Sequence, residues 1–242
     1  MKPVDTLFID KGGVLVDNEQ QSGQWQRLLG GFFPPRLGRT ADEWARANRI
    51  ALPRQIARWE TAAAMGTGPA DIRGWFNNDG RQWLYDMCDE LGVPRPRPEI
   101  ADGLAADAVR HVKTHLVFDA PRTLERLRAL KGRGLVLHMT SGDANDDLEP
   151  YLAQIGARDV FDRVYGSDLV NTWKTSVAYY RAILADTGAD PRRTWVIDDS
   201  PRAMEWAQQC GMRGFLVSHP SGEEFEAGVL RTLDELERAL SA

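Results

Sequence analysis

Side chains with carboxylate, hydroxyl and ammonium groups stand at or near the ends of several apolar, strand-like segments of this chain. In an open parallel sheet, ligands gather where the carboxyl ends of the strands meet, so these side chains are expected to converge. Carboxylate oxygens suit Mg²⁺, and a bound cation offsets the charge of a phosphate group. A site for Mg²⁺ and phosphate is therefore predicted from six residues: Asp10, Thr140, Ser141, Lys174, Asp198 and Asp199.

The segments that would position these residues alternate between strand and helix patterns. Short apolar runs rich in β-branched residues predict strands, and longer segments with apolar side chains on one face predict helices. This alternation is typical of parallel βαβ units, so we expect an α/β fold, a doubly wound parallel sheet with helices on both faces. The predicted strands are 4–9, 134–141, 163–166, 194–199 and 213–218, and the predicted helices are 123–134, 146–155, 176–187, 201–210 and 223–240.

The stretch 18–116 interrupts this alternation and predicts an inserted helical domain. It contains no convincing strand, and apolar residues recur at helical spacing, for example at Trp83, Leu84 and Met87. Clusters of proline and glycine divide the stretch into four or five helices. The predicted domains are an α/β core formed by 1–17 and 117–242 and an all-helical insertion over 18–116.

The composition excludes several classes of protein. With 43% hydrophobic and 27% charged residues, the chain has enough apolar side chains for a packed core and is not expected to be disordered. A net charge of -5 argues against nucleic-acid binding, which usually needs a basic excess. Cys88 and Cys210 are too few for a disulfide scaffold or a four-cysteine zinc site. No apolar run reaches the length of a membrane span, so we expect a cytoplasmic protein with neither nucleic-acid nor membrane partners.

Four short motifs, in the right order and over nearly the whole chain, resemble those of the haloacid dehalogenase (HAD) superfamily of phosphatases and related hydrolases. They are FIDKGGVLVD, VLHMTS, NTWK and VIDDSPRAMEWAQQCGM. In this family the first motif carries a nucleophilic aspartate, the second a hydroxyl that binds the phosphoryl group, the third a lysine, and the fourth the acidic residues beside the metal. The resemblance implies these roles for Asp10, Thr140, Lys174, Asp198 and Asp199, and it implies that the helical insertion is a cap over the active site.

The resemblance also implies a mechanism, hydrolysis of a phosphate ester through an aspartyl-phosphate on Asp10. Mg²⁺ would be held by Asp10, Asp199 and the backbone carbonyl of Gly12, with Asp198 beside it. The cation and the lysine of the third motif would neutralise charge, because an anionic carboxylate must approach an anionic phosphate. Backbone amides of the loop after Asp10, which includes Gly12, would bind phosphoryl oxygens. Ser141 is a further candidate for substrate binding, although a serine at this position is equally suited to cap the following helix.

One position departs from the family pattern. HAD phosphatases usually have a second aspartate two residues after the nucleophile, where it acts as general acid and base, and this chain has Gly12 there. Such a group typically contributes about 10²- to 10⁴-fold to the rate. Three explanations stay open: a substrate with a good leaving group, such as an anomeric sugar phosphate; a proton donor elsewhere, such as Asp17, Glu19 or a cap residue; or chemistry other than phosphate-ester hydrolysis.

Members of the superfamily that cleave carbon–halogen or carbon–phosphorus bonds also lack this aspartate. Retention of both Asp198 and Asp199 argues against the dehalogenase branch, which works without a metal. The phosphonatase branch needs a cap lysine for an imine with its substrate, and the insertion offers only Lys113, near its end. Two further alternatives are a phosphotransferase, which passes the phosphoryl group to an acceptor other than water, and a non-catalytic binding protein that kept the fold and lost turnover.

The insertion is rich in arginine and tryptophan. Six arginines lie between Arg36 and Arg58, against Asp42 and Glu43. Arginine suits phosphate and carboxylate groups, and tryptophan faces suit sugars, although both residue types also pack and coat a small helical domain. Arg36, at the end of FFPPR, is the candidate substrate contact. We therefore expect a Mg²⁺-dependent phosphatase that acts on a small phosphorylated metabolite, with a sugar phosphate as the favoured substrate.

Overall fold

The computed structural model describes residues 4–16, 18–64, 71–117, 120–217, 229–230, 235–236 and 240 of the chain. The chain divides into two compact units. One combines Met1–Asn18 with Phe118–Ala242, and the other is Glu19–Val117. They are named here the sheet unit and the helical unit.

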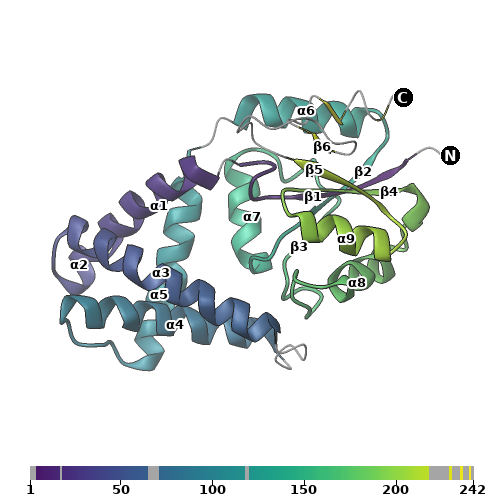
Figure 1. Ribbon diagram of the computed structural model, residues 1–242. Coiled ribbons are helices and arrows are strands. Elements are labelled where there is room, and N and C mark those ends of the chain that lie inside the picture. Colours follow the sequence, from purple (N-terminus) through teal and green to yellow (C-terminus); the bar gives the residue numbers. More distant parts are fainter. Residues whose placement is uncertain are drawn as a thin grey trace. The chain divides into compact units, whose positions relative to one another are not determined.

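The sheet unit is built on one six-stranded sheet in which every strand pairs in parallel with its neighbours, in the order β3-β2-β1-β4-β5-β6 (Figure 1). β1 lies between β2 and β4, and all of its residues are buried, as expected for a strand covered on both faces. The strands are β1 Thr6–Asp10, β2 Val136–Thr140, β3 Arg163–Tyr165, β4 Thr194–Asp198, β5 Arg213–Val217 and β6 Val229–Leu230.

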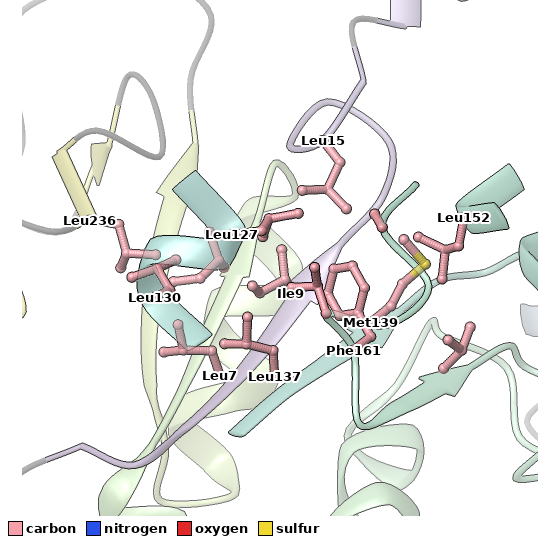
Figure 2. Close-up of a cluster of buried hydrophobic side chains, with 14 of the residues drawn as sticks. Leu7, Ile9, Leu15, Leu127, Leu130, Leu137, Met139, Leu152, Phe161 and Leu236 are labelled. Atoms are coloured by element: carbon pink, nitrogen blue, oxygen red, sulfur yellow. The ribbon is translucent and has the colours of Figure 1, made fainter. Parts of the chain in front are cut away.

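Alternate residues of β1 enter two apolar clusters, one on each face of the sheet. Leu7 and Ile9 lie in a cluster with side chains of α6 and α7 (Figure 2). Phe8 lies in a second cluster with side chains of α8 and α9. The predicted α/β fold, with a parallel sheet covered by helices on both faces, is therefore confirmed. The helices are α6 Ala120–Gly132, α7 Asn145–Gln154, α8 Val177–Thr187 and α9 Pro201–Gln209, with a short 3₁₀ helix at Pro191–Arg193.

The predicted closing helix over 223–240 is wrong at two of its residues. Val229–Leu230 forms β6, which pairs in parallel with the end of β5. The free backbone edge of a strand offers hydrogen-bond partners that a local helical pattern does not reveal. Residues 235, 236 and 240 are helical, and the remaining residues of the predicted helix lie outside the described part of the chain.

The described residues of the helical unit form five helices and no strand, in keeping with the helical periodicity of this stretch. Buried polar side chains join three of the helices. Asn48 of α3 donates a hydrogen bond to Gln26 of α1 at 3.0 Å and accepts one from the Trp83 indole of α4 at 2.9 Å. The helices are α1 Asn18–Phe32, α2 Pro34–Leu37, α3 Ala41–Ala64, α4 Ile72–Leu91 and α5 Pro98–His115.

Arginine and tryptophan side chains take part in this packing. Asp79 of α4 is buried and accepts hydrogen bonds from Gln55, Arg58 and Trp59 of α3. Trp44 of α3 is fully buried. Because a buried carboxylate is costly without partners, these donors hold α3 and α4 together. Part of the arginine and tryptophan content of this unit therefore serves its own core.

Neither cysteine forms a disulfide, and the described helices do not suit a membrane. Cys88 and Cys210 are both free thiols. Among the described residues, no helix is both long and apolar enough to cross a bilayer.

The side chain of His138 is enclosed in the sheet. Its ring centroid lies 5.7 Å from that of Phe8 and 5.8 Å from that of Tyr165. Its Nδ1 atom has no hydrogen-bond partner among the described residues. Burial lowers the pKa of His138 from 6.5 to about 4, so the imidazole is neutral in the folded protein at neutral pH.

We expect this histidine to make the fold sensitive to acid. The unfolded chain binds a proton on His138 more readily than the folded chain does. The contribution of the neutral imidazole to the free energy of unfolding is therefore complete above pH 6.5 and is lost as the pH falls towards about 4. The loss should be about 3 kcal/mol in the free energy of unfolding. His138→Phe keeps a ring of similar size and should remove this part of the loss, as measured by urea unfolding at several pH values.

His115→Phe is the matched control, because His115 is exposed at the end of α5. It should not remove the part of the acid-induced loss of stability that is assigned to His138. An equal loss of stability in the His138→Phe and wild-type proteins between these pH values would contradict the prediction.

Candidate active site

Three carboxylates from the ends of two neighbouring strands form one cluster. Asp10 is the last residue of β1, Asp198 is the last residue of β4, and Asp199 follows it. One carboxylate oxygen of each lies within 4.8 Å of the others. Asp10 and Asp198 are buried, at 7% and 1% exposure, whereas Asp199 is exposed. The structure thus brings these three candidate residues to the same end of the sheet.

Lys174 supplies an ammonium group to the two buried carboxylates. Its Nζ atom pairs with Asp10 Oδ1 and lies 2.8 Å from Asp198 Oδ2. The side chain of Lys174 is 9% exposed. Asp198 is held from two further directions, because Tyr180 donates its hydroxyl to Oδ2 at 3.3 Å and the Ser200 amide donates to Oδ1 at 2.9 Å. The orientation of the buried carboxylates is therefore fixed by several donors.

The charges in this cluster do not balance within the protein. Burial raises the pKa of Asp10 to about 7, with Lys174 lowering it and the charges of Asp198 and Asp199 raising it. Burial by itself lowers the pKa of Lys174, but the charges of Asp10 and Asp198 raise it well above its usual value. One ammonium group thus faces three carboxylates, and the nucleophile candidate cannot stay fully ionised at neutral pH without further positive charge.

The residues of the cluster fit a divalent cation. All three offer hard carboxylate oxygens close enough together to share one ion, and such oxygens are the preferred ligands of Mg²⁺. A cation would also lower the pKa of Asp10, which burial and, to a smaller extent, the charges of Asp198 and Asp199 raise. Asp10, Asp198 and Asp199 are therefore the residues that would hold it.

The loop after β1 folds back on itself and leaves Gly12 outside its hydrogen bonds. The Gly13 amide donates to the Val16 carbonyl at 2.8 Å, and the Leu15 and Val16 amides donate to the Lys11 carbonyl at 2.9 and 3.2 Å. These bonds use the peptide groups on either side of Gly12, as in a parallel bridge between Gly12 and Val16. The Gly12 carbonyl, predicted to be a metal ligand, accepts no backbone hydrogen bond from the described residues of this loop.

Thr140 brings an unpaired hydroxyl to the same edge of the sheet. It is the last residue of β2 and stands beside Asp10 in the register of β1 and β2. Thr140 is fully buried, and its Oγ1 atom has no hydrogen-bond partner among the described residues. A buried hydroxyl without a partner is costly, so its position favours a partner supplied by a ligand.

Ser141 is held by the loop that follows β2. Its hydroxyl oxygen accepts a hydrogen bond from the Asp143 amide at 3.1 Å, and its amide donates to the Tyr165 carbonyl at 2.9 Å. The interpretation of Ser141 as a cap of the following helix is wrong, because α7 begins at Asn145 and Ala144 is its N-cap. A contact between Ser141 and substrate stays a prediction.

Other candidates belong to the helical unit or lie outside the described residues. Arg36 belongs to α2 of the helical unit, where its guanidinium donates to the Phe32 carbonyl at 2.6 Å and lies 3.8 Å from the centroid of the Phe32 ring. Lys113 is buried in α5. Asp17 lies outside the described residues, and Glu19 is described only by its backbone, in α1. Roles for these side chains in substrate binding or proton transfer stay predictions.

Sequence reasoning missed two features around the cluster. Lys11 is 8% exposed and pairs with Asp143. Gly13 has a φ of 68°, and a Cβ atom there would lie 2.1 Å from Asp199 Oδ2. The two consecutive glycines after Lys11 signal a tight turn, but the residues that approach them come from distant parts of the chain, which local patterns do not show.

A protein-family model matches this chain. It is described as haloacid dehalogenase-like hydrolase and covers residues 4–211. No curated protein matches the chain.

Several solved structures are similar to this chain along its whole length. L-2-haloacid dehalogenase from Xanthobacter autotrophicus has a TM-score of 0.67 and 20% identity, with 98% of each chain covered. The putative HAD-hydrolase YfnB from Bacillus subtilis, bound to magnesium, has a TM-score of 0.70 and 17% identity, with 100% of each chain covered. 2-Haloacid dehalogenase from Pseudomonas syringae pv. Tomato DC3000 has a TM-score of 0.65 and 16% identity, with 98% of each chain covered. At these identities the likeness shows the fold.

The close approach of Gly13 and Asp199 gives a testable prediction. In Gly13→Ala, the new methyl group must displace the Asp199 carboxylate, so affinity for Mg²⁺ should fall by at least about tenfold, the effect expected when support of a metal ligand is lost. Isothermal titration calorimetry with MgCl₂ measures this affinity without reference to any reaction.

Gly134→Ala is the matched control. Gly134 has a φ of 84°, so alanine is strained there too, but a Cβ atom at Gly134 has no neighbour within 4 Å. Both variants should lose stability, and only Gly13→Ala should bind Mg²⁺ more weakly. Unchanged Mg²⁺ affinity in a folded Gly13→Ala protein would show that Asp199 does not hold the ion.

Proposed function

The chain belongs to the haloacid dehalogenase-like hydrolase family, and from this premise we propose that it is a Mg²⁺-dependent phosphatase. Its substrate would be a small phosphorylated metabolite, and a sugar phosphate is favoured. The reaction would pass through an aspartyl-phosphate on Asp10.

The observation that carries this proposal is the excess of negative charge in the cluster. One carboxylate oxygen of each of Asp10, Asp198 and Asp199 lies within 4.8 Å of the other two. Lys174 supplies the ammonium group that pairs with the two buried carboxylates. Such an arrangement favours a divalent cation, which in turn favours a dianionic phosphate group over a neutral reacting carbon. Reaction at a carbon–halogen bond has no need of the third carboxylate.

Asp10, Lys174 and Thr140 would each have a separate role in this reaction. Asp10 would attack phosphorus as an ionised carboxylate. Lys174 would offset the charge of this carboxylate, and because the lysine side chain is 9% exposed, water would screen the interaction little. The Thr140 hydroxyl, unpaired and buried beside Asp10, would donate a hydrogen bond to the phosphoryl group. A bound Mg²⁺ would supply the remaining positive charge. Water would then release phosphate from Asp10.

Gly12 limits the leaving groups that this site can serve. Without a carboxylic acid two residues after Asp10, the leaving oxygen has no proton donor from this loop. Esters whose leaving group departs easily, such as anomeric sugar phosphates, need that proton least. Arg36 and the other arginines of the helical unit would favour an anionic substrate, which agrees with this class.

Dehalogenation is a second candidate, favoured by a specific observation. Similar solved structures include L-2-haloacid dehalogenases, one of them with chloropropionic acid covalently bound. A nucleophilic aspartate and a nearby lysine serve displacement of halide as well as attack on phosphorus, and displacement of halide needs no general acid. Gly12 is therefore compatible with both reactions, whereas the carboxylate cluster favours the first.

A panel of phosphorylated metabolites and 2-haloalkanoates tests the proposal. The wild-type protein should release phosphate in the presence of Mg²⁺ and lose this activity in EDTA. Asp10→Asn should lower phosphate release by about 10³-fold or more, because the amide cannot act as the nucleophile. Colorimetric assays of phosphate and halide, run on the same samples, measure both reactions.

The pattern of products separates the alternatives. Halide release that persists in EDTA, without phosphate release, would replace the phosphatase by a dehalogenase. Binding of Mg²⁺ and inorganic phosphate with no turnover of any substrate would indicate a non-catalytic binding protein.

Gly12→Asp tests the effect of the missing acid. Gly12 does not have a positive φ, so an aspartate side chain is compatible with its backbone. With poor leaving groups, such as alkyl phosphates, kcat should rise by about 10²-fold or more, and with activated aryl phosphates it should change little. Gly12→Asn is the control, since it has similar size and no acidic proton. A fall in kcat of Gly12→Asp for every ester would show that another group already acts as the acid.

A further inference from the structure

A partly buried ion pair joins the loop after Asp10 to the loop after Thr140. Lys11 Nζ pairs with Asp143 Oδ2, and the two side chains are 10% and 23% exposed. The ammonium also lies 5.8 Å from the centroid of the Tyr151 ring. Neither residue of the pair belongs to the carboxylate cluster, and neither has a role in the mechanism proposed above.

Asp143 makes contacts with three loops of the candidate site. Its side chain pairs with Lys11, which follows the nucleophile candidate. Its amide donates to Ser141 Oγ at 3.1 Å, one residue beyond Thr140. Its carbonyl accepts from the Ser167 amide at 3.1 Å. The Ser167 hydroxyl oxygen in turn accepts from the Lys174 amide at 3.3 Å. Asp143 therefore connects the segments that carry the nucleophile, the hydroxyl and the lysine.

Backbone contact already fixes two of these loops to each other. A Cβ atom on Gly166 would lie 2.7 Å from the Asp143 carbonyl oxygen and 2.4 Å from the Asn145 amide nitrogen. The loop after β2 and the loop after β3 thus pack main chain against main chain, and this leaves little freedom between them. The side chain of Lys11 links these two loops to the residue directly after Asp10, and Lys174, from the segment after β3, pairs with Asp10 itself.

The energetics of buried charge indicate a geometric role for this pair. Removing two charges from water costs several kcal/mol, and a well-packed apolar pair of similar volume is often equally or more stable. A charged hydrogen bond, however, fixes the direction and distance between its partners more narrowly than an apolar contact does. The pair is therefore better suited to set the relative position of two loops than to stabilise the fold.

We propose that Lys11 and Asp143 are positioning residues that hold Asp10 in register with Thr140 and Lys174. This inference rests on the proposed function only in that Asp10, Thr140 and Lys174 act on one substrate. The pair would favour the transition state, in which all three groups must contact the reacting atoms together, more than it favours substrate binding.

A double-mutant cycle tests the pair through its kinetics. Lys11→Met and Asp143→Asn, which roughly preserve side-chain size, should each lower kcat by about tenfold or more while KM changes little. The double variant should be no slower than the slower single variant, because the single substitutions break the same contact. Lys11→Arg, which keeps the charge, should retain most of the activity. A rise in KM with kcat unchanged, or independent effects of the two substitutions, would overturn the proposal.

Lys131→Met is the matched control for a structural effect. Lys131 pairs with Asp162 at the end of α6, and their side chains are 34% and 39% exposed. It should leave kcat unchanged. If the Lys11→Met protein loses activity only in proportion to its loss of folded protein, as monitored by thermal unfolding, the role of the pair is stability and the proposal fails.

Hydrogen–deuterium exchange tests the same inference without a substrate. In Lys11→Met, amides of residues 11–16 should exchange faster than in the wild-type protein, while those of β4 should exchange at the same rate. Unchanged exchange in the nucleophile loop would overturn the positioning role. Failure of the wild-type protein to release phosphate would instead contradict the proposed function and leave the exchange result as the measure of this inference.

Discussion

The repulsion among three carboxylates at one end of the sheet is the constraint on which the rest of the candidate site depends. Asp10, Asp198 and Asp199 lie within 4.8 Å of one another, and two of them are buried. Charges this close in a poorly hydrated site interact far more strongly than in water. Lys174 offsets part of the repulsion, while burial, followed by the charges of Asp198 and Asp199, raises the pKa of Asp10 to about 7. A bound cation would favour the ionised form of the cluster.

The parallel sheet provides this arrangement through its register. β1 lies between β2 and β4, and strands in a sheet are spaced by about 4.8 Å. Asp10 is opposite Thr140 in one pairing, and the residue before it, Ile9, is opposite Ile197 in the other. The register of the strands therefore brings their ends together, and the loops that follow carry Lys11 and Lys174. The apolar clusters on both faces keep the strands in place, so the core of the sheet unit and the geometry of its site depend on the same residues.

Sequence patterns predicted the strands and the polar residues at their ends, because these features depend on residues close together in the chain. The apolar runs before Asp10, Thr140 and Asp198 marked strands, and the position of a polar residue after each run marked the edge where they meet. The patterns did not reveal β6, because Val229–Leu230 is extended only through pairing with β5. They also did not reveal the Lys11–Asp143 pair, whose members are 132 positions apart. Contacts of this kind depend on topology, and local periodicity carries no record of them.

The substitution of glycine for the second aspartate separates two parts of catalysis that usually occur together. The cluster keeps the groups that would neutralise the charge of a phosphate, since Lys174 and the three carboxylates are all present. Proton transfer to the leaving group is not provided by the same residues. Lys174 cannot take it over, because Asp10 and Asp198 raise the pKa of its ammonium despite burial and so make it a poor acid. The leaving group must therefore depart without a proton, or receive one from a donor outside this cluster. The chemistry of the substrate's leaving group is thus part of the mechanism.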